Sequence, residues 1–270
     1  MKKKVLTLLL LLTVLVCLLT VTASAERYQL WVGGMQVTDE NQSGEGWSYD
    51  PDTATLTLRD FQYTGSNAKQ AGIYAGMDLT IRLEGHNNSI NSEPYEEIFW
   101  ECYGVYVKGA LSFSGDGSLD VEADDARDYS CGISASSLTT AADFSGTIYA
   151  LGGNTTGSFS PSSCGIRTGQ LSIAGGTVKG EGGTASVASD GIFAANSVQI
   201  IGGSVQGLAG AGGESYGIRC ERGTVTIQGA DTVVTAGISE RSQSGIVPGS
   251  YAYGLREHRT EKRDAELPEI

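Results

Sequence analysis

A short pattern of apolar and small residues recurs along most of the chain. It opens with a glycine followed by one branched aliphatic residue, and in most units an apolar-x-apolar pair follows six to eight residues later. The opening pairs are Gly72-Ile73, Gly104-Val105, Gly132-Ile133, Gly165-Ile166, Gly191-Ile192, Gly217-Ile218 and Gly254-Leu255. The apolar period of two inside each unit predicts β-strands. Self-similarity at this spacing predicts a stack of repeats in which neighbours bury each other's apolar faces.

Glycines separate the strands within each unit. Gly175-Gly176 precedes Thr177-Val178, and Gly202-Gly203 precedes Ser204-Val205. Three strands per unit, with glycine at corners that need an unusual backbone conformation, predict an all-β, single-stranded, right-handed parallel β-helix (β-solenoid). We expect residues 67–255 to form its coils, with Ile, Val and Leu side chains stacked inside. The unit after Gly132 leaves two places open for its second strand, around Leu138 or around Ala142 and Phe144.

The two ends of the chain differ from the repeats. Residues 1–25 combine Lys2 to Lys4, an apolar run and the triplet Ala23-Ser24-Ala25, which predicts a signal peptide cleaved before Glu26 and a secreted, extracellular protein. An uncleaved membrane anchor is the alternative, because the apolar run approaches the length that spans a bilayer. Residues 26–66 are predicted to form an N-terminal β-hairpin cap over the open end of the stack. Residues 256–270 are predicted to be a charged, disordered tail.

Composition and charge narrow the range of partners. The chain has 38 glycines in 270 residues but is 40% hydrophobic, which indicates a turn-rich folded domain. Its formal net charge of −13 becomes −16 when the three lysines of the predicted signal peptide are removed. A chain with this negative charge is expected to repel nucleic acid and anionic lipid. Neither a nucleic acid nor a membrane is therefore a predicted partner of the cleaved protein. The oligomeric state stays open.

The repeat resembles that of a known family. The unit Gly-Ile, then Leu-x-Ile, then Gly-Gly-x-Val is clearest at 165–178 and 191–205. It is similar to the repeat of secreted bacterial parallel β-helix proteins of Gram-positive cell surfaces that are grouped as carbohydrate-binding. The segment Leu30-Trp31-Val32-Gly33-Gly34 also resembles the start of many such proteins. The resemblance covers about residues 30–255 and implies binding of polysaccharide and calcium.

The residue two after each repeat glycine is predicted to point outward if the aliphatic residue between them points inward. This column contains Tyr74, Tyr106, Ser134, Arg167, Phe193, Arg219 and Arg256. We expect Tyr74, Tyr106, Arg167, Phe193 and Arg219 to bind an extended polysaccharide, with sugar faces on the rings and hydroxyls or carboxylates on the guanidinium groups. An ordinary strand surface, with no ligand, is the alternative interpretation.

An acidic run from Asp116 to Asp128 is the candidate metal site. Calcium takes six to eight oxygen ligands, and Asp124, Asp125 and Asp128 are its candidate carboxylates. A solvated acidic loop is the alternative. Arg127 lies between two of these acids, which is the one arrangement in the chain that suits a calcium-dependent uronate lyase.

Four cysteines follow the predicted signal peptide: Cys102, Cys131, Cys164 and Cys220. Cys131 and Cys164 each precede a repeat glycine in consecutive units, so they are expected to be stacked neighbours within the range of a disulfide. Two small buried side chains without a bridge are the equal alternative.

Taken together, these patterns favour a secreted, non-catalytic module that binds carbohydrate or another surface, with calcium as a structural ion. No catalytic residue is assigned. A calcium-dependent polysaccharide lyase is the enzymatic alternative, and a passive surface adhesin or spacer is the second.

Overall fold

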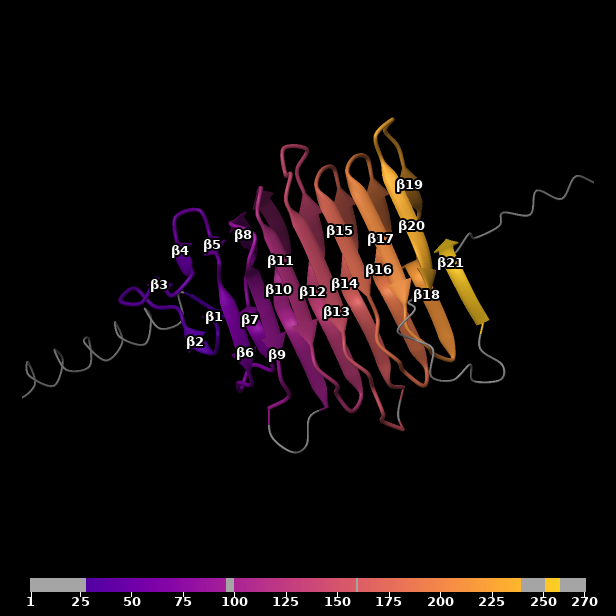
Figure 1. Cartoon of the computed structure of the whole chain (residues 1–270), viewed down its shortest axis with the longest axis horizontal. Helices are drawn as coiled ribbons and strands as arrows, with labels where there is room; N and C mark the ends of the chain where they lie inside the picture. Colours follow the sequence, from indigo (N-terminus) through magenta and orange to yellow (C-terminus); the bar gives the residue numbers. More distant parts are fainter. Residues whose placement is uncertain (1–27, 96–99, 159, 239–250, 258–270) are drawn as a thin grey trace, which may run out of the picture.

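The structure is a computed structural model, and it describes residues 28–95, 100–158, 160–238 and 251–257 (Figure 1). These residues contain no helix, and their strands stack as a β-solenoid of about six turns. The predicted all-β parallel β-helix is therefore confirmed. The predicted signal peptide lies outside the described residues. Within them, no helix has the length and apolar character needed to cross a bilayer.

Two parallel sheets form the walls of the solenoid. The larger one contains the long strands β10 (Glu101–Gly115), β12 (Tyr129–Thr140), β14 (Ser162–Ile173) and β16 (Ala188–Ile200), flanked by β7 (Ala71–Ala75), β8 (Leu79–Glu84), β18 (Glu214–Cys220) and β19 (Val225–Ile227). The smaller one contains β6 (Gln62–Gly65), β9 (Asn88–Ser92), β11 (Ser118–Ala123), β13 (Thr147–Gly152), β15 (Thr177–Glu181), β17 (Ser204–Ala209) and β20 (Val233–Ile238). We call them the first and the second sheet. Each long strand contains the first two strand segments of a predicted unit.

Aliphatic residues stack in register through the interior of the first sheet. Ile73, Val105, Ile133, Ile166, Ile192 and Ile218 pair each with the next and are fully buried. We call these six residues the inner column. They pack in one hydrophobic core with residues of the second sheet such as Leu119, Ile148, Val178 and Val205. The predicted stack of inward aliphatic side chains is thus confirmed.

The repeat glycines lie where the two sheets approach each other most closely. A Cβ atom at Gly165 would stand 2.1 Å from the backbone nitrogen of Glu181, and one at Gly191 would stand 2.2 Å from that of Leu208. No side chain fits in that space. At Gly132, Gly165 and Gly191 the backbone of the second sheet therefore requires glycine, whereas at Gly72 and Gly104 the nearest atoms belong to the side chains of Ile90 and Val121.

Antiparallel strands cover the N-terminal end. β1 (Leu30–Val32) pairs antiparallel with β2 (Met35–Gln36) and with β7, while β4 (Trp47–Asp50) pairs antiparallel with β3 (Ser43–Gly44) and β5 (Thr55–Arg59). β5 and β6 also pair in parallel with β8 and β9. The region predicted as a cap thus contains both the antiparallel cover and the first strands of the parallel stack.

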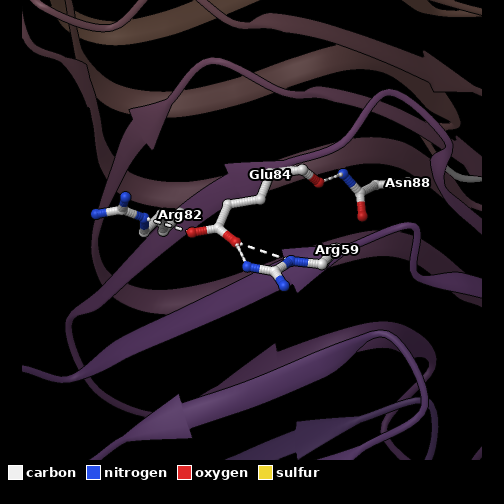
Figure 2. Close-up of polar contacts among 4 residues, drawn as sticks. All are labelled: Arg59, Arg82, Glu84 and Asn88. Atoms are coloured by element: carbon white, nitrogen blue, oxygen red, sulfur yellow. Dashed lines mark hydrogen bonds and ion pairs between the residues drawn. The ribbon is translucent and has the colours of Figure 1, made fainter.

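The corner between β8 and β9 is held by polar side chains (Figure 2). The amide of Asn88 is buried, accepts a hydrogen bond from the Phe61 backbone nitrogen at 2.9 Å and donates to the carbonyls of Glu84 at 3.0 Å and Ser118 at 2.8 Å. The Glu84 carboxylate accepts from Arg59 and from Arg82. These guanidinium groups hold the pKa of Glu84 below its usual value. The three hydrogen bonds of the Asn88 side chain, to Phe61, Glu84 and Ser118, join three successive coils.

The unit after Gly132 keeps its second strand at Leu138. Leu138 pairs with Leu111 on one side and Leu171 on the other, so the strand does not lie around Ala142. Phe144 lies in the following turn, buried, with its ring centroid 6.5 Å from that of Phe113. Thr140 is the buried one of the two threonines after Leu138, and it pairs with Phe113 on one side and Ile173 on the other.

The last described strand, β21 (Tyr251–Glu257), pairs in parallel with β18. It includes Arg256 and Glu257, the first two residues of the predicted tail. Residues 258–270, the rest of that tail, lie outside the described residues.

Candidate ligand-binding face

The outward residues of the first sheet form one continuous line along the solenoid. Backbone pairing places Trp31, Tyr74, Tyr106, Ser134, Arg167, Phe193 and Arg219 opposite one another in that order. We call this line the outer column. All five predicted ligand-binding residues lie in it, and their role in binding stays a prediction. Trp31 was not foreseen, because the antiparallel pairing of β1 with β7 brings it there.

The N-terminal half of the outer column is aromatic. Tyr74 makes edge contacts with Trp31 and with Tyr106, at centroid distances of 5.4 and 5.7 Å. Tyr103 stacks on Tyr106 at 4.6 Å with an angle of 13° between the rings, and lies 5.5 Å from Tyr129. We call Tyr74, Tyr103, Tyr106 and Tyr129 the tyrosine platform. Tyr74, Tyr106 and Tyr129 are partly exposed, so this half offers apolar ring surface to solvent.

The C-terminal half of the outer column is built from two guanidinium groups around one ring. Arg167 lies 4.7 Å and Arg219 lies 5.4 Å from the ring centroid of Phe193. Phe193 is only 6% exposed, so a ligand would meet the two guanidinium groups rather than its ring. Phe193 therefore supports the arginines through cation–π contacts.

A second outward line runs beside the outer column, one residue before each repeat glycine. It contains Ala71, Tyr103, Cys131, Cys164, Asp190 and Tyr216, paired in that order. We call it the second outer column. The glycine and the aliphatic residue after it both face inward, so the residues on either side of that pair both face outward.

Asp190 is the charged member of the second outer column. It is 6% exposed, its Oδ2 lies 3.9 Å from Nη1 of Arg219, and its buried Oδ1 has no hydrogen-bond partner within the described part of the chain. Burial raises the pKa of Asp190 to about 7, and Arg219 opposes that rise. Arg219 also lies 3.6 Å from Glu214 and 3.9 Å from Glu221.

Cys131 and Cys164 are neighbours in the second outer column, as the sequence predicts. Their Sγ atoms are 3.3 Å apart and both residues are buried thiols. The hydroxyl of Tyr129 lies 2.9 Å from Sγ of Cys164. The pair and Tyr103 pack together under Tyr74, Tyr106 and Tyr129.

Two of the three predicted calcium carboxylates, those of Asp124 and Asp125, accept hydrogen bonds from different groups. Oδ1 of Asp124 accepts from the backbone nitrogen of Asp125 at 2.7 Å, and Asp125 accepts from the backbone and side-chain nitrogens of Asn154 at 2.6 and 3.3 Å. Oδ1 of Asp128 is buried and has no hydrogen-bond partner among the described residues. No group of three or more His, Cys, Asp or Glu residues that could hold a metal ion occurs in the described segments. Calcium binding at these residues stays a prediction.

The outer face of the second sheet is acidic and hollowed. One cavity of about 190 Å³ is lined by Glu122, Asp125 and Glu181 among others, and one of about 230 Å³ is lined by Asp120, Glu122 and Tyr149 among others. Glu181 is buried, accepts a hydrogen bond from Tyr149 at 2.8 Å and lies 3.3 Å from Nζ of Lys179. This face thus differs in chemistry from the aromatic and guanidinium-bearing first sheet.

No protein-family model, curated protein or solved structure matches the chain. The chemistry of these two faces is therefore the basis for inferring what the protein binds.

Proposed function

We propose that this protein is a secreted, non-catalytic carbohydrate-binding module that holds a polysaccharide along the outer column. The observation that supports this is the in-register line of Trp31, Tyr74 and Tyr106, continued by Arg167 and Arg219. Rungs about 4.8 Å apart place these groups at regular intervals along one axis, which suits an extended polymer. The apolar faces of sugars pack on aromatic rings, and hydroxyl or carboxylate oxygens accept from guanidinium groups.

The resemblance of the repeat to secreted carbohydrate-binding β-helix proteins supports the same proposal. The two alternatives predict different behaviour. A uronate lyase would rely on Arg127, whose guanidinium carbon lies 4.1 Å from the centroid of the Trp100 ring. A passive spacer would show no preference for any part of the outer column.

The test is retention of the protein on insoluble polysaccharides. Tyr106→Ala should weaken binding by about fivefold, because it removes a stacking surface worth on the order of 1 kcal/mol. The matched control is Tyr149→Ala, which removes a tyrosine from the outer face of the second sheet. Retention of Tyr149→Ala should equal that of the unsubstituted protein. The thermal midpoint of Tyr106→Ala should fall by only a few °C from the loss of its ring contacts with Tyr74 and Tyr103, so the protein is still folded at the assay temperature.

The same assay separates the alternatives. Equal retention of Tyr106→Ala and the unsubstituted protein would favour the spacer. Parallel columns with and without a chelator test the role of calcium. Release of unsaturated uronides, seen by ultraviolet absorbance and lost in Arg127→Ala, would favour the lyase instead.

A further inference from the structure

Two thiols from consecutive coils meet beneath the tyrosine platform. Cys131 on β12 pairs directly with Cys164 on β14, and their Sγ atoms are 3.3 Å apart. One rung of about 4.8 Å between the backbones falls inside the Cα range of disulfides, roughly 4.4 to 6.8 Å. Small rotations of the two side chains would therefore suffice to bring the sulfurs to bonding distance.

The other two described cysteines have different surroundings. Sγ of Cys102 donates to the carbonyl of Ser92 at 3.2 Å, beside Ala123 and Ala126. Sγ of Cys220 lies 3.8 Å from the carbonyl of Thr224. Of the four described cysteines, Cys131 and Cys164 are the pair whose sulfur atoms are in contact.

We propose that Cys131 and Cys164 form a disulfide that covalently joins two consecutive coils beneath the tyrosine platform, by exchange with a small disulfide such as oxidised glutathione. The bond would close a loop between residues 33 positions apart. It would tie together the strands that carry Tyr129 and Arg167.

The surroundings assign a role to each thiol. Burial opposes ionisation of Cys131, but hydrogen bonds from Cys164 and Tyr129 and the nearby Arg167 guanidinium outweigh it and lower the pKa of Cys131. Burial and the neighbouring Cys131 raise the pKa of Cys164. The hydrogen bond that Cys164 donates to Sγ of Cys131 at 3.3 Å favours a thiolate at Cys131, so the exchange starts from Cys131 and Cys164 is the resolving thiol.

The exchange proceeds in two balanced steps. The Cys131 thiolate attacks one sulfur of the donor disulfide, which forms a mixed disulfide and releases one donor thiolate. Cys164 then gives up its proton and its sulfur attacks Sγ of Cys131, which releases the second donor thiolate. The two protein thiols are oxidised to one disulfide, the donor disulfide is reduced to two thiols, and the two protons pass to the released thiolates.

Access to the thiols controls the rate. Cys131 is fully buried and Cys164 is 2% exposed, under the rings of the tyrosine platform. A donor reaches Cys131 only when these rings move apart. Oxidation of the folded protein is therefore expected to be slow and to accelerate under mildly destabilising conditions that keep the chain folded.

The test uses the full chain with Cys17→Ser, which leaves the four described cysteines. The folded protein is equilibrated with oxidised and reduced glutathione, then denatured and alkylated without reductant for mass spectrometry. In the expected product only two of the four cysteines are alkylated. After digestion, the Cys131 peptide and the Cys164 peptide are found joined by a disulfide, with a combined mass two hydrogen atoms below the sum of the reduced peptides. Its thermal midpoint should rise by about 5–15 °C and fall back after reduction.

Matched variants locate the bond. Cys131→Ser and Cys164→Ser should each abolish the cross-linked peptide, whereas Cys102→Ser and Cys220→Ser should retain it. Alkylation of all four cysteines at saturating oxidised glutathione would overturn the proposal, and so would a bridge that includes Cys102 or Cys220. Peptide mapping of the chain with all four cysteines is sufficient even if a serine variant fails to fold. Because the readout does not involve polysaccharide, this outcome is independent of the proposed binding function.

Discussion

The inner and outer columns lie on the same strands, one residue apart, yet they differ in how much variation they carry. Every member of the inner column is isoleucine or valine and is fully buried. The outer column changes from tryptophan and tyrosine through serine to arginine and phenylalanine. Packing in the interior requires similar shapes on successive rungs, whereas an outward position meets solvent and its neighbours only. Chemistry can therefore vary along the outside of this fold without changing the fold.

The strongest test of this difference is Ile166→Ala in the inner column. It removes three buried carbon atoms from the centre of the stack and leaves a cavity that the coils above and below cannot fill. We expect the free energy of unfolding to fall by about 2–5 kcal/mol. Urea denaturation measures this loss, and a loss below about 1 kcal/mol would show that the inner column is not the main source of stability.

The columns themselves could be predicted from the sequence, because an apolar period of two fixes which residues share a face. The second outer column could not be predicted by alternation alone. Strict alternation puts Cys164 and Ile166 on the same face, but Gly165 and Ile166 both point inward and the order changes at that glycine. This change of order arises where the glycine lies against the second sheet. That contact joins residues far apart in the sequence, so local alternation does not reveal it.

A serine ladder was also missed, although the sequence contains its signal. Serine stands two residues before the repeat glycine in four consecutive units, at Ser130, Ser163, Ser189 and Ser215. The hydroxyls of the first three accept hydrogen bonds from the backbone nitrogens of Gly153, Gly183 and Gly210, at 2.7 to 2.8 Å. The environment of Asp190, by contrast, depends on Arg219 from the next coil and could not be predicted from local spacing.

Asp190→Asn tests whether a buried charge on the outer side weakens the stack. Burial raises the pKa of Asp190 to about 7 in the folded protein, with Arg219 and Arg167 lowering it and Glu214 and Glu221 raising it. The unfolded chain loses this proton near pH 4, so the contribution of Asp190 to stability falls as the pH rises from about 4 to 7. Asn cannot ionise, and we expect it to stabilise the protein by up to about 4 kcal/mol above pH 7.

Unfolding free energies at pH 4.5 and pH 8 measure this effect. The difference between Asp190→Asn and the unsubstituted protein should be small at the lower pH and largest at the higher one. Stability curves that run parallel across this range would mean that Asp190 is ionised at both values and that its burial carries no such cost.

Ser163→Ala tests the polar part of the interior. It removes the hydroxyl that accepts from the Gly183 backbone nitrogen at 2.7 Å and leaves that donor without this partner. We expect a loss of about 1–2 kcal/mol in the free energy of unfolding. Ser162→Ala, one residue earlier and partly exposed, is the matched control and should cost less than about 0.5 kcal/mol. Equal losses for the two variants would show that the hydrogen bond of the Ser163 hydroxyl does not contribute measurably to stability.

Arg167→Ala has the smallest expected effect on stability and decides how the outer column is understood. Arg167 is exposed and follows Ile166 directly, so the two substitutions act at adjacent positions of one strand but on opposite faces. Loss of its cation–π contacts with Tyr129 and Phe193 should cost about 0.5–1 kcal/mol, while retention on polysaccharide should fall as it does for Tyr106→Ala. If Arg167→Ala instead destabilised the protein as much as Ile166→Ala, its loss of retention would reflect unfolding. The outer column would then be a structural element, and binding would have to be sought on the acidic face of the second sheet.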